Sequence, residues 1–209
     1  GGSELTMNTR IELGQMFPSI AKDSNGNSVV AWQGFDGSDE GVFAQRFNSN
    51  WEKVGPEFQA NTYVNRWQRR PDVAMDANGN FVAVWESEAQ DNPDSYSGVY
   101  AQRYNANGEK QGLEFKVNSN TIDIQDYPKV AMDANGNFVA VWESRFQDGS
   151  GFGIYAQRYD SQGNPQGPEF LVNSNAAGHQ YYPDVAMDPQ GNFVITWQNQ
   201  DPAPGFDDN

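Results

Sequence analysis

The chain has 209 residues, a formal net charge of −15 and no cysteine. The negative charge disfavours nucleic acid and anionic membranes as partners and leaves cations, basic proteins and neutral sugars open. Without cysteine, disulfides and thiolate chemistry are excluded. No apolar run approaches the roughly 18 residues of a membrane span, so we expect no membrane insertion.

One sequence motif recurs along the chain in four units, the last of which is incomplete. A Pro-x-[Ile/Val]-Ala segment that leads to a Gly-Asn pair and a tryptophan starts at Pro18, Pro71, Pro128 and Pro183. Successive prolines lie 53, 57 and 55 residues apart. Tandem units of this length bury their apolar faces against one another. We therefore predict a single repeat domain over residues 1–209, in which residues 4–17 are the last strand and linker of a preceding repeat.

The residue pattern of a complete unit predicts four short strands, as the second unit illustrates. Residues 71–75 begin with proline, which suits the first position of a strand. Residues 81–85 are apolar on both faces, which indicates a strand inside a packed assembly. Residues 99–104 alternate between two faces, and residues 114–117 complete the unit. Turn signals of the type Asp-x-x-Gly and Asn-x-x-Gly separate the strands, and no segment has a helical period.

Four antiparallel strands per unit match the blade of a β-propeller. We predict an all-β, propeller-like array of four-stranded antiparallel blades, with a stacked β-solenoid as the alternative. The buried set is expected to contain Val73, Phe81, Ala83, Trp85, Tyr100 and their equivalents. Trp51 stands where the other units have a turn glycine, so a distorted turn is expected there.

The repeated motif resembles tandem repeats of large exported bacterial proteins, which often carry hemolysin-type calcium-binding repeats elsewhere. The resemblance lies in the blocks PDVAMDANGNFVAVW from Pro71 and GVYAQRY from Gly98, and covers the chain from Glu4 to about Gly205. It implies an extracellular or cell-surface setting for a secreted, bacterial protein. It transfers no catalytic residue.

Calcium is the candidate cofactor. The Asp-x-Asn-Gly turns offer one carboxylate each, which is too few for the six to eight oxygen ligands of calcium, so they are read as hairpin turns. The loops between the second and third strands vary in length and are more acidic, and variable loops often carry binding residues. The candidate metal ligands in these loops are Asp36, Asp39, Glu40, Asp91, Asp94 and Asp148. A solvated, metal-free acidic loop is the alternative for each.

A sugar site is the candidate for ligand binding. An indole ring stacks on a pyranose face, while carboxylate and guanidinium groups hydrogen-bond ring hydroxyls. The candidate residues are Trp85, Glu86, Arg103, Trp142, Glu143 and Arg158. Because a tryptophan recurs at this position in every unit, packing between blades is the alternative for the indoles. The arginines have a similar alternative, in which they link adjacent blades.

These observations predict a non-catalytic extracellular module that binds carbohydrate or another surface ligand multivalently, as in adhesion, and no enzyme. Weak sites repeated at fixed spacing gain avidity without strong individual affinity. The first alternative is a purely structural spacer or assembly unit of a surface protein or filament, and a less favoured one is a glycoside-acting enzyme. The single histidine cannot supply a metal site or a triad alone, so any enzymatic chemistry would rest on carboxylates.

The strand edges are the remaining prediction. Residues 4–8 match the last strand of a unit, and the fourth unit has no block that matches a third strand. An unpaired strand edge is a template for another chain. We therefore expect neighbouring repeats or subunits as partners through these edges.

Overall fold

A computed structural model describes residues 4–9, 14–91 and 96–200. All regular structure in these ranges is β-strand, which confirms the predicted all-β class. Correspondingly, the described part of the chain contains no helix that could cross a lipid bilayer.

Three of the sheets are four-stranded antiparallel meanders, and a fourth contains two strands. The first sheet comprises β1 (Met16–Lys22), β2 (Ser28–Phe35), β3 (Glu40–Phe47) and β4 (Lys53–Gln59). The second comprises β5 (Gln68–Met75), β6 (Phe81–Glu88), β7 (Ser97–Tyr104) and β8 (Phe115–Lys116). The third comprises β9 (Gln125–Met132), β10 (Phe138–Arg145), β11 (Phe152–Tyr159) and β12 (Phe170–Leu171). The fourth sheet comprises β13 (His179–Met187) and β14 (Phe193–Gln200).

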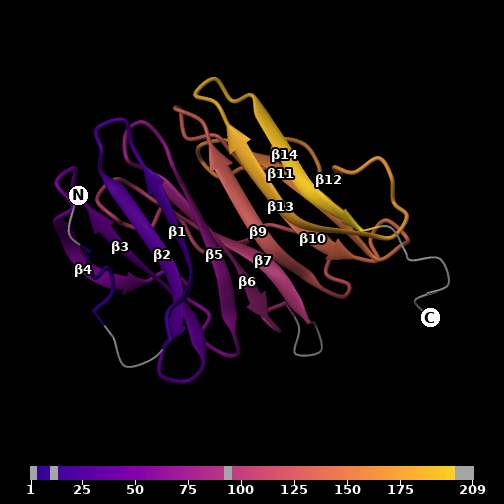
Figure 1. The fold of residues 1–209 in the computed structure, drawn as a ribbon, viewed down its shortest axis with the longest axis horizontal. Coiled ribbons are helices and arrows are strands. Elements are labelled where there is room, and N and C mark those ends of the chain that lie inside the picture. Colours follow the sequence, from indigo (N-terminus) through magenta and orange to yellow (C-terminus); the bar gives the residue numbers. More distant parts are fainter. Residues whose placement is uncertain (1–3, 10–13, 92–95, 201–209) are drawn as a thin grey trace.

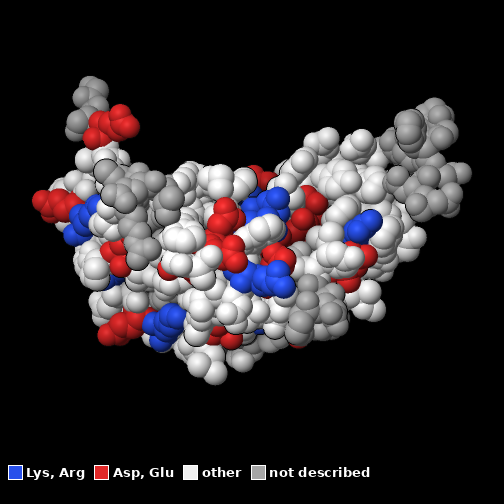
Figure 2. Space-filling model, turned by 90° about the horizontal axis from the view of Figure 1, so that it is seen from below, with Lys and Arg blue, Asp and Glu red and all other residues white. Residues whose placement is uncertain are grey.

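The sheets follow one another across the molecule like the blades of a propeller (Figure 1). Their first strands pack in sequence, β1 on β5, β5 on β9 and β9 on β13. We call these four strands the inner strands. The predicted propeller-like array is therefore present. On the face seen in Figure 2, acidic and basic atoms lie next to one another near the middle of the molecule.

An aspartate organises the turn between the first and second strands of every sheet. In the second sheet, Oδ1 of Asp76 accepts the backbone N–H groups of Asn78 at 2.8 Å and Asn80 at 2.9 Å. Its Oδ2 accepts the side-chain amide of Asn80 at 2.7 Å. Gly79 follows in the left-handed region with φ of 88°. The same side-chain and backbone pattern is found at Asp23, Asp133 and Asp188.

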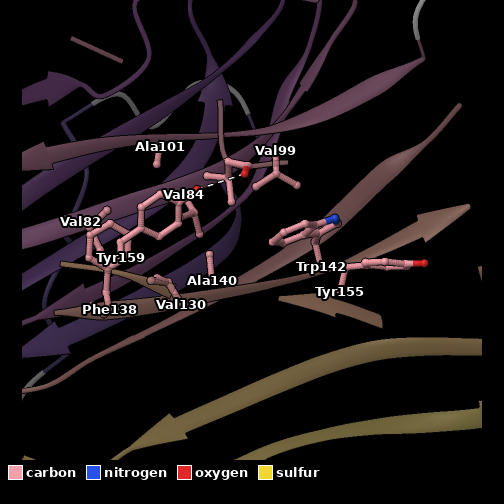
Figure 3. Close-up of a cluster of buried hydrophobic side chains, with 12 residues drawn as sticks. Val82, Val84, Val99, Ala101, Val130, Phe138, Ala140, Trp142, Tyr155 and Tyr159 are labelled. Carbon is pink, nitrogen blue, oxygen red and sulfur yellow. Dashed lines mark hydrogen bonds between the residues drawn. The ribbon is translucent and has the colours of Figure 1, made fainter. Parts of the chain in front are cut away.

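The core consists of apolar clusters between neighbouring sheets. Figure 3 shows one such cluster, in which Val82 and Val84 of the second sheet meet Phe138 and Trp142 of the third. The five predicted core residues of the second unit are all buried, which confirms that set. The outer sheets differ from this prediction, since Ile20, the equivalent of Val73 in the first sheet, is 54 % exposed and Trp197 of the fourth sheet is 37 % exposed.

Three local predictions differ from the structure. Residues 4–8 form no strand, so that prediction was wrong, although Met7 packs against the apolar cluster of the first sheet. The predicted strand at residues 114–117 shrinks to Phe115–Lys116. Trp51 does not distort its turn, since it adopts φ of 65° and its N–H still donates to the Asn48 carbonyl at 2.9 Å.

Candidate functional site

Every inner strand carries a bulge immediately before its proline. The residue at this position has a positive φ in all four sheets, and none of the four is a glycine: Phe17 at 50°, Arg70 at 51°, Tyr127 at 49° and Tyr182 at 53°. The strand register shifts at the same place in each sheet. A non-glycine residue in this region costs on the order of 1 kcal/mol or more, and such strain often accompanies functional sites. Bulges also redirect side chains.

The four bulges surround a cavity of about 330 Å³. Its lining comes from all four inner strands: Phe17, Pro18, Arg70, Pro71, Tyr127, Pro128, Lys129, Tyr182, Pro183 and Asp184. The scaffold is the same in each sheet, but the side chains at the bulge differ. The repeated backbone therefore presents four different groups to one cavity.

Aromatic rings and one guanidinium group form the wall of this cavity. The Arg70 guanidinium carbon lies 3.9 Å from the ring centroid of Tyr127 and 5.9 Å from that of Phe17. Tyr127 and Tyr182 meet edge to face with their centroids 5.1 Å apart. Tyr182 is 56 % exposed and Phe17 is 49 % exposed. Exposed ring faces of this kind can stack on the apolar face of a sugar.

The residue before each bulge faces the second strand of its own sheet, and the pair has a different chemistry in each sheet. Arg69 lies opposite Glu86, and Asp126 lies opposite Glu143. The corresponding pairs in the outer sheets are Met16 with Gln33 and Tyr181 with Gln198. The charged pairs are thus confined to the two middle sheets.

Two arginines hold the carboxylate of Glu86, which is 3 % exposed. Arg69 Nη2 lies 3.1 Å from its Oε1, and Arg70 Nη1 donates to its Oε2. The same Nη1 of Arg70 lies 3.8 Å from Oδ2 of Asp126. Glu86 and Asp126 therefore share one guanidinium nitrogen, although they come from different sheets. These ion pairs offset part of the cost of removing the carboxylate from water.

The other two carboxyl groups favour the protonated form. Burial, followed by the negative charges of Glu86 and Glu143, raises the pKa of Asp126 to about 8 against the opposing effect of the arginines. Burial also raises the pKa of Glu143 to about 7, although the Tyr182 N–H donates to its Oε1 at 2.6 Å. One buried oxygen of Asp126, Oδ1, has no hydrogen-bond partner.

This arrangement places a carboxyl group that pairs with two arginines and a carboxyl group of raised pKa beside an aromatic cavity. Carboxyl groups whose environments move their pKa values apart can serve as the acid and the base of one reaction. Glycoside hydrolysis commonly uses such a pair, with the acid protonating the leaving oxygen and the carboxylate supporting the cationic transition state.

Two of the six sugar-binding candidates from the sequence, Glu86 and Glu143, lie in this site. Trp85 and Trp142 are completely buried between the sheets, so their rings present no face to a ligand. Arg103 and Arg158 lie toward the other end of the sheets. Arg103 donates to the Ser161 carbonyl at 2.5 Å and thereby joins two sheets, which matches the alternative considered for the arginines.

The metal-ligand candidates do not converge. Among the residues that the structure describes, no three histidine, cysteine or acidic side chains are grouped to hold a metal. Asp36 accepts the N–H groups of Ser38 and Asp39, and Asp39 accepts the Trp67 indole N–H at 2.5 Å. Glu40 begins β3 opposite Phe35.

In the second and third loops the candidates are also separate. Asp91 accepts the Tyr100 hydroxyl, and Oδ1 of Asp148 accepts the Ser150 N–H at 3.1 Å. Asp94 lies outside the described residues.

The sequence reasoning missed the two residues before each proline, which carry most of the site. In the four units these pairs read Met-Phe, Arg-Arg, Asp-Tyr and Tyr-Tyr, inside a segment whose other positions repeat closely. That local variability within a constant repeat was the available signal. The bulge that directs these side chains into a common cavity cannot be recognised from residue type, because no glycine marks it.

No protein-family model and no curated protein sequence matches this chain. Solved structures do resemble it. A protein of unknown function from Dyadobacter fermentans is 12 % identical with a TM-score of 0.61, over 90 % of this chain and 62 % of that one. An α-L-arabinofuranosidase from Fusarium graminearum is 14 % identical with a TM-score of 0.60, over 91 % and 61 %. An endo-arabinase from Bacteroides thetaiotaomicron is 18 % identical with a TM-score of 0.55, over 97 % and 76 %.

The chain thus spans about three fifths of the length of the first and second of these structures. At these identities the likeness establishes a shared propeller fold. The structures that share it include enzymes that act on glycosides, which contradicts the prediction of a non-catalytic module and no enzyme. The repeat motif directed attention to constant, structural positions, whereas the chemistry of the inner strands lies in the variable ones.

Proposed function

We propose that the chain acts on glycosidic bonds at the cavity between its inner strands. The observation that carries this proposal is the convergence of Glu86, Asp126 and Glu143 on Arg70 next to exposed aromatic rings. Three buried carboxyl groups around one guanidinium are costly to maintain for structure alone, because each charge removed from water needs compensation. A catalytic role supplies a reason for that cost.

Asp126 is the candidate proton donor. Its raised pKa of about 8 keeps it protonated at neutral pH, and it directly precedes Tyr127, which lines the cavity. Glu86 is the candidate second carboxyl group, since Arg69 and Arg70 both form ion pairs with it. Glu143 is a positioning residue, because it accepts the backbone N–H of Tyr182 and so fixes a bulge that lines the cavity.

The aromatic wall is the candidate sugar platform. The rings of Phe17 and Tyr182 are exposed, and Tyr127 is fixed beneath the Arg70 guanidinium. The similar structures support this substrate class at the level of the fold, since two of those named above are an endo-arabinase and an α-L-arabinofuranosidase. The extracellular location expected from the repeats is part of the proposal, because it would bring the chain into contact with polysaccharides.

The test is hydrolysis of a panel of glycans and nitrophenyl glycosides that begins with arabinan and α-L-arabinofuranosides. We expect Asp126→Asn and Glu86→Gln each to lower kcat by about 100-fold or more, since a positioned acid or base contributes about that factor. Asp160→Asn is the matched control, because this aspartate caps an exposed turn away from the cavity. Full activity in Asp126→Asn, or no hydrolysis of any panel member by the unchanged chain, would contradict the proposal.

A further inference from the structure

The sheets are joined by a tyrosine socket that appears twice with the same geometry. Tyr104 of β7 stacks on Phe81 of its own sheet with ring centroids 4.7 Å apart. Its other side meets Phe58 of the preceding sheet at 5.4 Å, and its hydroxyl donates to the Ala60 carbonyl at 3.1 Å. The third strand of the second sheet is therefore anchored to the first sheet by a single side chain.

The third sheet repeats the arrangement. Tyr159 of β11 stacks on Phe138 at 4.7 Å and meets Phe115 of the preceding sheet at 5.6 Å. Its hydroxyl donates to the Val117 carbonyl at 3.0 Å, the bond drawn as a dashed line in Figure 3. The socket thus consists of one phenylalanine from each of two sheets and a backbone carbonyl.

The fourth sheet offers the same socket. Phe193 of β14 corresponds to Phe138, and Phe170 and Val172 of the third sheet correspond to Phe115 and Val117. Among the described aromatic contacts, none involves Phe170 or Phe193, and Phe170 is 37 % exposed. The structure therefore displays two completed sockets and one that is open.

A groove beside the socket shows the same contrast. Between the first and second sheets it measures about 210 Å³ and includes the turn residues Ala106 and Asn107. Between the second and third sheets it measures about 380 Å³ and includes the equivalent turn residues Ser161 and Gln162. Between the third and fourth sheets it widens to about 570 Å³, and no equivalent turn is among its lining residues.

An arginine holds the turn in both filled grooves. Arg46 donates to the Ala106 carbonyl at 2.7 Å, and Arg103 donates to the Ser161 carbonyl at 2.5 Å. Arg158 is their equivalent at the wide groove. It is exposed, and its guanidinium donates to the Gln166 carbonyl next to its own sheet at 3.4 Å.

The apolar residues of β14 are also uncovered. Val194 is 61 % exposed, whereas its equivalents Val82 and Val139 are completely buried. Trp197 is 37 % exposed, whereas the tryptophan at this position in the third sheet lies opposite Tyr155 of the third strand and is fully buried. A third strand laid along β14 would supply the corresponding cover.

We infer that the edge of the fourth sheet is a docking site for a strand-and-turn segment of the chain's own repeat class. The segment would pair antiparallel with β14 as β7 pairs with β6. Its tyrosine would enter the socket of Phe170 and Phe193, and its turn would fill the wide groove beneath Arg158. Recognition by strand addition of this kind takes affinity from the backbone ladder and specificity from side-chain pockets.

The test uses a peptide with the sequence of residues 97–112, which contains the third strand and turn of the second sheet. We expect saturable one-to-one binding with a blue shift of the Trp197 emission, which Trp197→Phe removes. Arg158→Ala weakens binding about tenfold or more, since a charge-assisted hydrogen bond contributes at least that factor. Arg46→Ala is the control and leaves binding unchanged, because Arg46 holds the turn at Ala106 between the first and second sheets, away from the edge of the fourth sheet. A peptide with alanine in place of its second tyrosine, the residue equivalent to Tyr104, binds more weakly.

An isolated peptide loses entropy when it folds onto an edge, so a second measurement fuses the same peptide to the chain through a flexible Gly/Ser linker. We expect a higher Tm and less quenching of Trp197 by acrylamide in the fusion than in the matched fusion with alanine at that tyrosine. Equal values in the two fusions, together with no binding of the free peptide, would overturn the inference. Concentration-dependent dimerisation of the unmodified chain that buries Trp197 would also overturn it, because a second copy would then be the occupant.

Discussion

The burial of Asp126 predicts that removing its ability to ionise stabilises the protein at high pH while strongly lowering the proposed activity. Asp126→Asn keeps the shape of the side chain but cannot ionise. The raised pKa means that the folded protein binds a proton more tightly than the unfolded chain does, so stability is present at low pH and is lost as pH rises from about 4 to about 8. The Asp126→Asn variant cannot ionise at this position, so its stability does not fall in this way as pH rises.

The magnitude follows from the pKa. A rise from 3.8 to about 8 corresponds to on the order of 5 kcal/mol at pH 8, at about 1.4 kcal/mol per pKa unit. Asparagine must still place a polar atom where Oδ1 is buried without a partner, which costs about 1–3 kcal/mol. We therefore expect a net gain of about 2–4 kcal/mol at pH 8 and a net loss of about 1–2 kcal/mol at pH 4, where the charge contributes little and the unpaired polar atom still costs free energy.

The assay is urea unfolding of both proteins from pH 4 to pH 8, followed by intrinsic tryptophan fluorescence. Asp184→Asn serves as the control, since this aspartate is exposed at the rim of the same cavity. A constant difference between Asp126→Asn and the unchanged chain over this pH range would refute the reasoning. So would a variant that is less stable at pH 8.

Three further predictions concern packing and ion pairs. Glu86→Gln leaves two arginines without their buried partner and is expected to lower the free energy of unfolding by about 2 kcal/mol in urea titrations. Arg103→Ala is expected to lower it by about 1–2 kcal/mol, because the residue joins two sheets, whereas Arg158→Ala leaves it within about 0.5 kcal/mol. Trp142→Ala, at a fully buried site, is expected to cost about 3–5 kcal/mol by thermal or chemical unfolding, and Trp197→Ala clearly less. Equal effects within either matched pair would contradict the difference between the covered sheets and the fourth sheet on which these predictions rest.

The repeats made the fold predictable because local and long-range signals agree in them. The Asp-x-x-Gly turns and the apolar strands between them each favour the same blade, and neighbouring units supply the cover that one unit lacks. Trp51 marks a limit of that reasoning, since the surrounding turn imposes a left-handed conformation on a residue that disfavours it. Tertiary context here overrides residue preference.

The site was less predictable for a physical reason. Asp126 and Glu86 are separated by forty positions in the chain, and they share Arg70 only because β9 packs against β5 and β6. Their chemistry depends on burial and on a shared arginine, neither of which sequence spacing reports. Glu143 was recognised as a candidate because it follows a repeated tryptophan, but its role in holding the Tyr182 bulge depends on the fold.

The repeated bulge has a consequence for how such a chain can diversify. Each blade holds its backbone in the same shape at this point whichever side chain it carries, as the phenylalanine, arginine and two tyrosines demonstrate. Duplication of one unit therefore copies the bulge together with its scaffold, and the residue at the bulge is then free to change. A single codon change there alters the chemistry of the cavity without touching turns, strand register or the apolar clusters. Gene duplication can in this way assemble an asymmetric set of reactive groups from symmetric parts.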